Sequence, residues 1–181
     1  MKKYGMIAVG LVLGVVGLVQ AGSFRQLLTE EKAALGATHV AVINYADFAG
    51  STTTNTAGTV TFTNAVSAYS SVQGVWYELP QAFAYGYNGA AATNGMTNAI
   101  LYVGVPSAVS NLLGATEMGA ATTPVYSRWG QGPNAGISFN AVATTNIVAT
   151  LSGNPYGALS QLTNGQVRIY LRILTRSTQL D

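Results

Sequence analysis

The chain has 181 residues, enough for one domain with a substantial core, and its 49% hydrophobic content excludes a disordered chain. Only 8% of the residues are charged, against about 25% in an ordinary soluble domain, and there is one His and no Cys. Proton transfer, metal binding and nucleophilic catalysis need such groups, and disulfides need Cys. We therefore expect a structural protein and no enzyme, with no catalytic residue, cofactor or metal site.

The formal net charge of +2 overstates how basic the folded part is. Lys2 and Lys3 lie in a leader-like segment, and without them the basic and acidic residues are equal in number. A body with almost no net charge has no field that would attract nucleic acid, so we expect no nucleic-acid partner. Weak charge repulsion between copies favours a homo-oligomer.

Residues 1–21 have the pattern of a secretory signal peptide. A short basic start precedes an apolar run at 6–19, and Val19 and Ala21 provide small residues before Gly22. The run is shorter than the roughly 20 residues that cross a bilayer. We expect a cleaved leader, and the alternatives are a retained membrane anchor or a buried hydrophobic helix. Any membrane contact is expected through residues 1–21 alone.

Residues 22–36 predict a short amphipathic helix. Ser23 can cap it, with Gln26 three residues later completing a capping box, and Gly36 is a natural end. Its apolar side would consist of Phe24, Leu27, Leu28 and Leu35.

Residues 37–181 predict one β-sandwich domain. Short apolar or alternating segments are separated by links rich in Gly, Asn, Ser, Thr and Pro, which indicates an antiparallel sandwich or jelly roll. The fold class is thus mainly β, with one short helix after the leader. The expected strands are 39–45, 59–63, 72–79, 98–105, 137–142, 146–151 and 166–174. Residues 85–98 are expected to form a surface loop.

The last expected strand, 166–174, has the clearest alternation. Its odd-numbered residues are apolar, and its other side carries a row of basic and aromatic residues. We take that row, Arg168, Tyr170, Arg172 and Arg176, as the candidate interface. It could contact carboxylates of a neighbouring subunit or phosphates. The alternative is an exposed sheet face whose Arg stems cover apolar surface, since the chain has few acids to pair with them.

Few residues could carry catalysis. His39, the only His, opens an apolar strand and is expected to be structural. A two-carboxylate glycosidase site would need Glu78 and Glu117 to converge. Trp76 and Tyr77 give Glu78 an aromatic neighbourhood that can bind sugar, but a strand with one exposed Glu explains the same residues.

Three segments resemble small virion structural proteins of tailed bacteriophages. One is Leu159-x-x-Leu162-x-x-Gly165-x-Val167-x-Ile169-Tyr170-x-Arg172, and the others are His39–Tyr45 and Leu101–Gly104 with Leu113–Met118. The resemblance implies a capsid decoration or cement subunit that packs against copies of itself and other virion proteins. Two features differ from that family: Val105-Pro106-Ser107 replaces an Asp-Gly turn, and a leader-like segment comes first.

The first hypothesis is therefore a structural subunit located in a virion. The alternative is an exported bacterial surface or extracellular matrix protein, adhesive, polymerising or glycan-binding, that partners envelope proteins after secretion. A minor alternative is a secreted glycosidase that uses Glu78 and Glu117.

Overall fold

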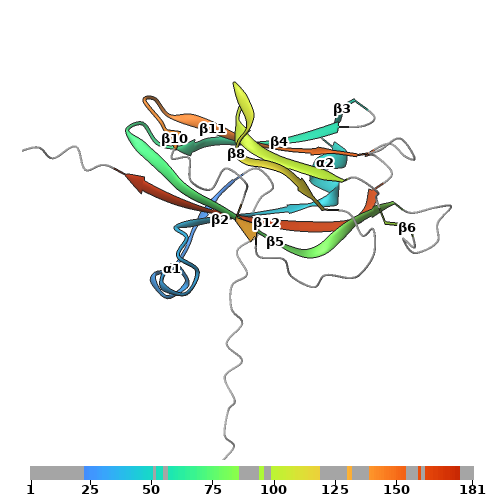
Figure 1. Cartoon of the computed structure of the whole chain (residues 1–181), viewed down its shortest axis with the longest axis horizontal. Coiled ribbons are helices and arrows are strands. Elements are labelled where there is room, and N and C mark those ends of the chain that lie inside the picture. Colours follow the sequence, from blue (N-terminus) through green and yellow to red (C-terminus); the bar gives the residue numbers. More distant parts are fainter. Residues whose placement is uncertain are drawn as a thin grey trace, which may run out of the picture.

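The computed structural model describes residues 23–50, 52–54, 57–85, 94–95, 99–118, 130–131, 139–153, 159 and 162–175. Two antiparallel sheets lie face to face with the hydrophobic core between them (Figure 1). The predicted mainly-β sandwich is confirmed, while the finer assignment as a jelly roll stays a prediction. The leader at 1–21 and Arg176 lie outside the described residues.

The first sheet, called sheet A, is built around the C-terminal strand. In order it contains β1 (Arg25–Gln26), β2 (His39–Asn44), β12 (Leu162–Thr175), β5 (Ser70–Tyr85) and β10 (Phe139–Asn140). Two further short strands, β6 (Asn94–Gly95) and β9 (Gly130–Gln131), also pair with β5. Ile169 of β12 lies opposite Ala41 on one side and Tyr77 on the other, so β12 is a central strand.

The second sheet, called sheet B, is formed by the middle of the chain. In order it contains β3 (Thr52–Thr54), β4 (Ala57–Val66), β11 (Thr145–Ser152), β7 (Ile100–Val105) and β8 (Ala108–Glu117). Strand β8 was not predicted. The β7–β8 pairing has register irregularities, and the consecutive residues Leu112 and Leu113 of β8 are both buried. The sequence of β8 therefore lacks the alternation of buried and exposed residues that indicates a strand.

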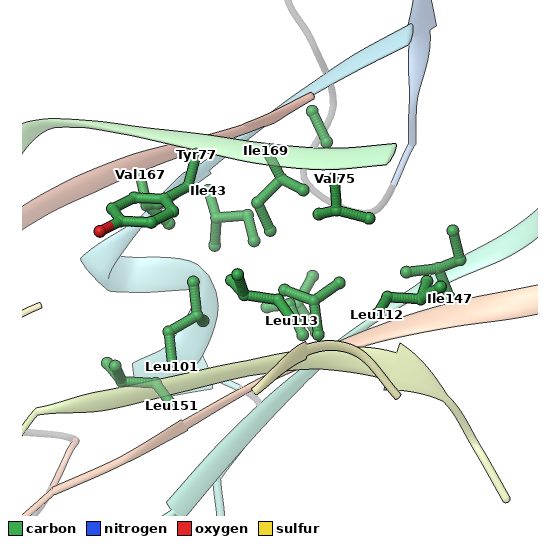
Figure 2. Close-up of a cluster of buried hydrophobic side chains, with 14 of the residues drawn as sticks. Ile43, Val75, Tyr77, Leu101, Leu112, Leu113, Ile147, Leu151, Val167 and Ile169 are labelled. Atoms are coloured by element: carbon green, nitrogen blue, oxygen red, sulfur yellow. The ribbon is translucent and has the colours of Figure 1, made fainter. Parts of the chain in front are cut away.

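Side chains from the two sheets meet in the core. Figure 2 shows Ile43, Val75, Tyr77, Val167 and Ile169 pointing toward Leu101, Leu113, Ile147 and their neighbours. Val167, Ile169 and Leu171 are fully buried, so the predicted alternation of the last strand is confirmed.

The N-terminal helix begins later than predicted. Helix α1 is Thr29–Leu35, and Arg25–Gln26 is instead strand β1, so a helix capped by Ser23 is wrong. Glu31 provides the N-terminal contact that Gln26 was expected to give, because its Oε2 accepts the Leu28 N–H at 2.8 Å. Gly36 ends the helix as predicted, with φ of 66°.

A second, unpredicted helix closes one end of the core. Helix α2 (Tyr45–Gly50) follows β2 of sheet A and leads to β3 and β4 of sheet B. Asp47, its third residue, makes a capping-box contact at the start of the helix, since its Oδ2 accepts the Asn44 N–H at 2.8 Å. Phe48 is its buried residue and packs edge-on against Phe83 at a centroid distance of 5.7 Å.

Strand β5 is longer than predicted because it passes through bulges. Glu78 pairs with Arg168 and Gln81 with Gln166, so β5 has one extra residue between these pairs, next to Pro80. Proline cannot donate a ladder hydrogen bond and is tolerated in sheets at bulges. The expected strand at 137–142 corresponds within the described residues to β10, and the expected loop at 85–98 lies mostly outside them.

Candidate functional site

The described residues of the predicted interface row lie on the outer face of sheet A, the side that points away from the core. Arg168 is opposite Glu78, Tyr170 is opposite Trp76, and Arg172 is opposite Gly74. Arg168, Tyr170 and Arg172 therefore share one face, as the alternation predicted. Their role as an interface stays a prediction.

Glu78 connects two members of this row. Its Oε2 accepts hydrogen bonds from Arg168 Nη1 and from the Tyr170 hydroxyl, both at 3.0 Å. The Glu78 side chain is 16% exposed and that of Arg168 is 41% exposed. One of the few acids of the chain is thus the partner of Arg168. Burial, followed by the Glu78 hydrogen bond, raises the pKa of Tyr170.

Replacing Glu78 with leucine should destabilise the fold by about 2 kcal/mol, because the hydrogen bonds that Glu78 accepts from Tyr170 and from Arg168 are both lost. Glu78→Gln keeps an oxygen for Tyr170 and should lose about half as much. Urea unfolding at pH 7 measures both losses. Equal losses would mean that the Tyr170 hydrogen bond does not stabilise the fold.

A small second core divides the outer face of sheet A. Leu27, Ala37 and Val40 pack on Tyr170, with Leu35 of α1 and Trp76 at the margin. The six-membered ring of Trp76 lies close to Gly74, where an added Cβ would stand 2.6 Å from its Cη2 atom. Arg168 is therefore paired and Tyr170 is covered, while Arg172 is exposed.

Thr38 and His39 form a polar junction at the start of β2. Thr38 extends the pairing with β12: its N–H donates to the Leu171 carbonyl at 2.7 Å, and its Oγ1 accepts the Ile173 N–H at 2.8 Å. His39 Nδ1 lies 2.8 Å from the same Oγ1. Burial, and then the positive charge of Lys32, lower the pKa of His39 below its usual 6.5. This environment fits the structural role expected for His39.

The lowered pKa of His39 predicts a loss of stability in mild acid. Below pH 6.5 the unfolded chain binds a proton that the folded chain does not yet bind, so the free energy of unfolding falls until the folded pKa is passed. Urea titrations between pH 7.5 and pH 5 should show this fall in the wild type and a flatter profile in His39→Gln. Lys32→Gln should reduce the fall. Identical profiles for wild type and His39→Gln would contradict the prediction.

The outer face of sheet B has a different chemistry. Strands β3, β4, β7 and β11 contain no Asp, Glu, Lys or Arg, and the one charged residue in the sheet is Glu117 at the end of β8. Thr150 pairs with Thr59 on one side and Tyr102 on the other, which makes a neutral row across three strands. The two Thr hydroxyls lie 3.1 Å apart. The alternating Thr residues of 59–63 signalled a polar face in sequence, but their pairing with Thr150 did not follow from it.

An open pocket lies where β4, β5 and β10 end. It has a volume of about 270 Å³ and is lined by Tyr69, Ser70, Asn140, Ala141 and Val142. Tyr69 is 61% exposed and Val142 is 81% exposed. Tyr69 also has a φ of 59°, a left-handed backbone conformation that residues with a Cβ rarely adopt. Large apolar side chains are thus exposed together at this end of the sandwich.

Glu78 and Glu117 do not converge. Glu78 is on the outer face of sheet A. Glu117 is opposite Ile100 in sheet B, and because the next residue, Leu101, points into the core, Ile100 and Glu117 belong to the outer face of that sheet. The core separates the two positions, so the carboxylate pair expected for the glycosidase alternative is not formed. Among the described residues, no three His, Asp or Glu side chains gather as metal ligands would. None of the described helices has the length and hydropathy needed to cross a bilayer.

Comparison with known proteins gives no match for this chain, whether to a family model, to a curated protein or to a solved structure. The features of the described residues that bear on function are the two outer faces and their charges.

Proposed function

We propose that this protein is a structural subunit that assembles with copies of itself, and that the assembly is part of a virion shell. The observation that carries the proposal is the separation of charge between the two sides of the sandwich. Sheet A and α1 hold most of the charged residues that the structure describes, namely Arg25, Glu30, Glu31, Lys32, Glu78, Arg168 and Arg172. The outer face of sheet B is almost without charge.

This separation fits a subunit with one face toward water and one face toward a neighbour. Charged residues are depleted at the centres of protein interfaces, whereas the free surface of a soluble domain normally mixes both signs of charge. The exposed Tyr69 and Val142 add apolar surface that a partner could cover. A structural role needs no catalytic residue, cofactor or bound nucleic acid.

The resemblance to phage structural proteins supports the virion part of the proposal. The three similar segments fall on β2, on β7 with β8, and on β12, so they include strands of both sheets. A decoration or cement subunit of this kind would contact copies of itself and other shell proteins.

Sedimentation velocity over a wide concentration range tests the assembly. We expect species larger than a monomer whose fraction rises with protein concentration. A monomer at every concentration, including in the presence of the particles with which the protein occurs, would overturn the proposal.

Immunogold electron microscopy tests the location. Label on the surface of virus-like particles is the expected result. Label confined to the bacterial envelope or extracellular material would overturn the virion assignment and favour the exported surface protein.

A further inference from the structure

We infer that the outer face of sheet B packs against the same face of a second copy of this chain. This inference rests on the proposed function and adds the surface and the partner. The surface is called the neutral face and is centred on Thr59, Thr61, Ile100, Tyr102, Thr150 and Ser152.

Register and burial define this surface. Thr150 lies opposite Thr59 and Tyr102, and in the next outward row Ser152 lies opposite Ile100. The residues between these rows, such as Leu151, are fully buried in the core. The neutral face is therefore formed by regular strands on a packed core, and its residues hold fixed positions relative to one another.

The charge pattern favours a partner surface that is itself uncharged, and a second copy of this chain provides one. A surface that brought a Lys, Arg, Asp or Glu against the neutral face would bury a charge with no opposite charge to pair with it, which is unfavourable. A copy of the neutral face brings no such group, because β4, β7 and β11 lack charged residues. By contrast, the outer face of sheet A already carries Arg172 and the Glu78–Arg168 pair, and α1 covers part of it.

The polar groups of the neutral face are suited to lose water. The hydroxyls of Thr59 and Thr150 are 3.1 Å apart and can bond to each other, so their burial leaves fewer unpaired groups. Tyr102 and Ile100 lie beside them and provide larger apolar side chains. Aromatic residues such as Tyr are enriched at interface centres.

The size of the neutral face predicts a weak contact. The three strands β4, β11 and β7, spaced about 4.8 Å apart with about eight residues each, cover about 400 Å² per partner. This is less than the roughly 800 Å² per partner of standard stable complexes. An isolated pair should therefore dissociate readily, and the contact should persist where each subunit is also held by other contacts.

A charge-swap experiment at Thr150 tests the inference. Thr150→Lys alone and Thr150→Glu alone should each weaken self-association at least tenfold, because like charges then meet across the contact within about one Debye length. An equal mixture of the two variants should recover association and form mixed species. Sedimentation velocity measures the association, and one variant with a fluorescent label reports mixed species.

Matched variants separate this result from misfolding and from failure of the proposed function. Ala33→Lys adds a charge on an exposed position of α1, away from the neutral face, and should associate like the wild type. Thr150→Val adds no charge but removes the hydroxyl partner of Thr59, so it should weaken association less than either charged variant does. If the wild type assembles and both charged variants assemble equally well, the neutral face is not the contact, although the structural role stands. Weakened variants that the mixture does not rescue would mean that a different surface faces Thr150. A wild type that never assembles would contradict both proposals.

Discussion

Replacing Gly165 with alanine is expected to destabilise the protein by about 3–5 kcal/mol, a large part of the roughly 5–15 kcal/mol that stabilises a typical domain. Two effects add at this position. Gly165 has a φ of 133°, which L-residues rarely adopt. An added Cβ would also stand 2.7 Å from Cγ and 2.8 Å from Cε1 of the Phe83 ring. Phe83 is fully buried, so its ring cannot move aside into solvent.

Gly36→Ala is the matched control, because Gly36 also has a positive φ but an added Cβ there meets nothing within 4 Å. It should cost about 1–2 kcal/mol through backbone strain alone. In the double variant Gly165→Ala/Phe83→Leu, the smaller leucine side chain should relieve the clash. The loss of stability should then be smaller than the sum of the losses of the two single variants. Urea unfolding measures the wild type, the single variants Gly165→Ala, Gly36→Ala and Phe83→Leu, and the double variant. Equal losses for the two glycine variants would mean that the Phe83 contact is not the reason for Gly165.

The parts of the fold that follow from local rules could be predicted. Strand β12 alternates over its core residues, and a two-residue period suffices to place Val167, Ile169 and Leu171 inside. Gly36 ends α1 because left-handed backbone favours glycine at that position. Arg168, Tyr170 and Arg172, the described residues of the interface row, share one face for the same reason that the core residues share the other.

The parts that depend on pairing between distant segments could not be predicted. Nothing near Arg168 in sequence shows that Glu78, ninety positions earlier, would lie opposite it. The neutral face likewise needs the order of β4, β11 and β7, which sequence alone does not define.

Short or irregular elements escaped prediction for another reason. Six residues are too few for α2 to display a helical period, and the irregular register of β8 hides its alternation. Ser23 and Gln26 fit a capping box, but Glu31 forms a bidentate pair with Arg25 as well as the Leu28 contact. The helix therefore begins at Thr29, which makes Glu31 its third residue, the position from which a side chain can accept the N–H of the residue before the helix.

Phe48→Ala should have the second large effect, a loss of about 3–5 kcal/mol. Phe48 is the buried residue of α2, it is fully enclosed, and its ring packs on Phe83. The neighbouring chain is also tight, since an added Cβ on Gly58 would lie 3.2 Å from the Phe48 carbonyl carbon. Because Phe83 packs on the Phe48 ring and Gly58 packs on the Phe48 backbone, α2 can move little, and most of the cavity left by the missing ring should stay open.

Phe48→Leu fills most of the same volume and should lose less than about 1.5 kcal/mol, so the difference between the two variants measures the cavity. Amide hydrogen exchange locates the effect. Because α2 leads from sheet A to sheet B at one end of the sandwich, Phe48→Ala should speed exchange in α2 and the adjoining end of β4 more than in the centre of β12. Uniform acceleration across both sheets would show instead that α2 and the sheets unfold as one cooperative unit. In that case the helix would help to hold the sheets together and would not simply cover the end of the core.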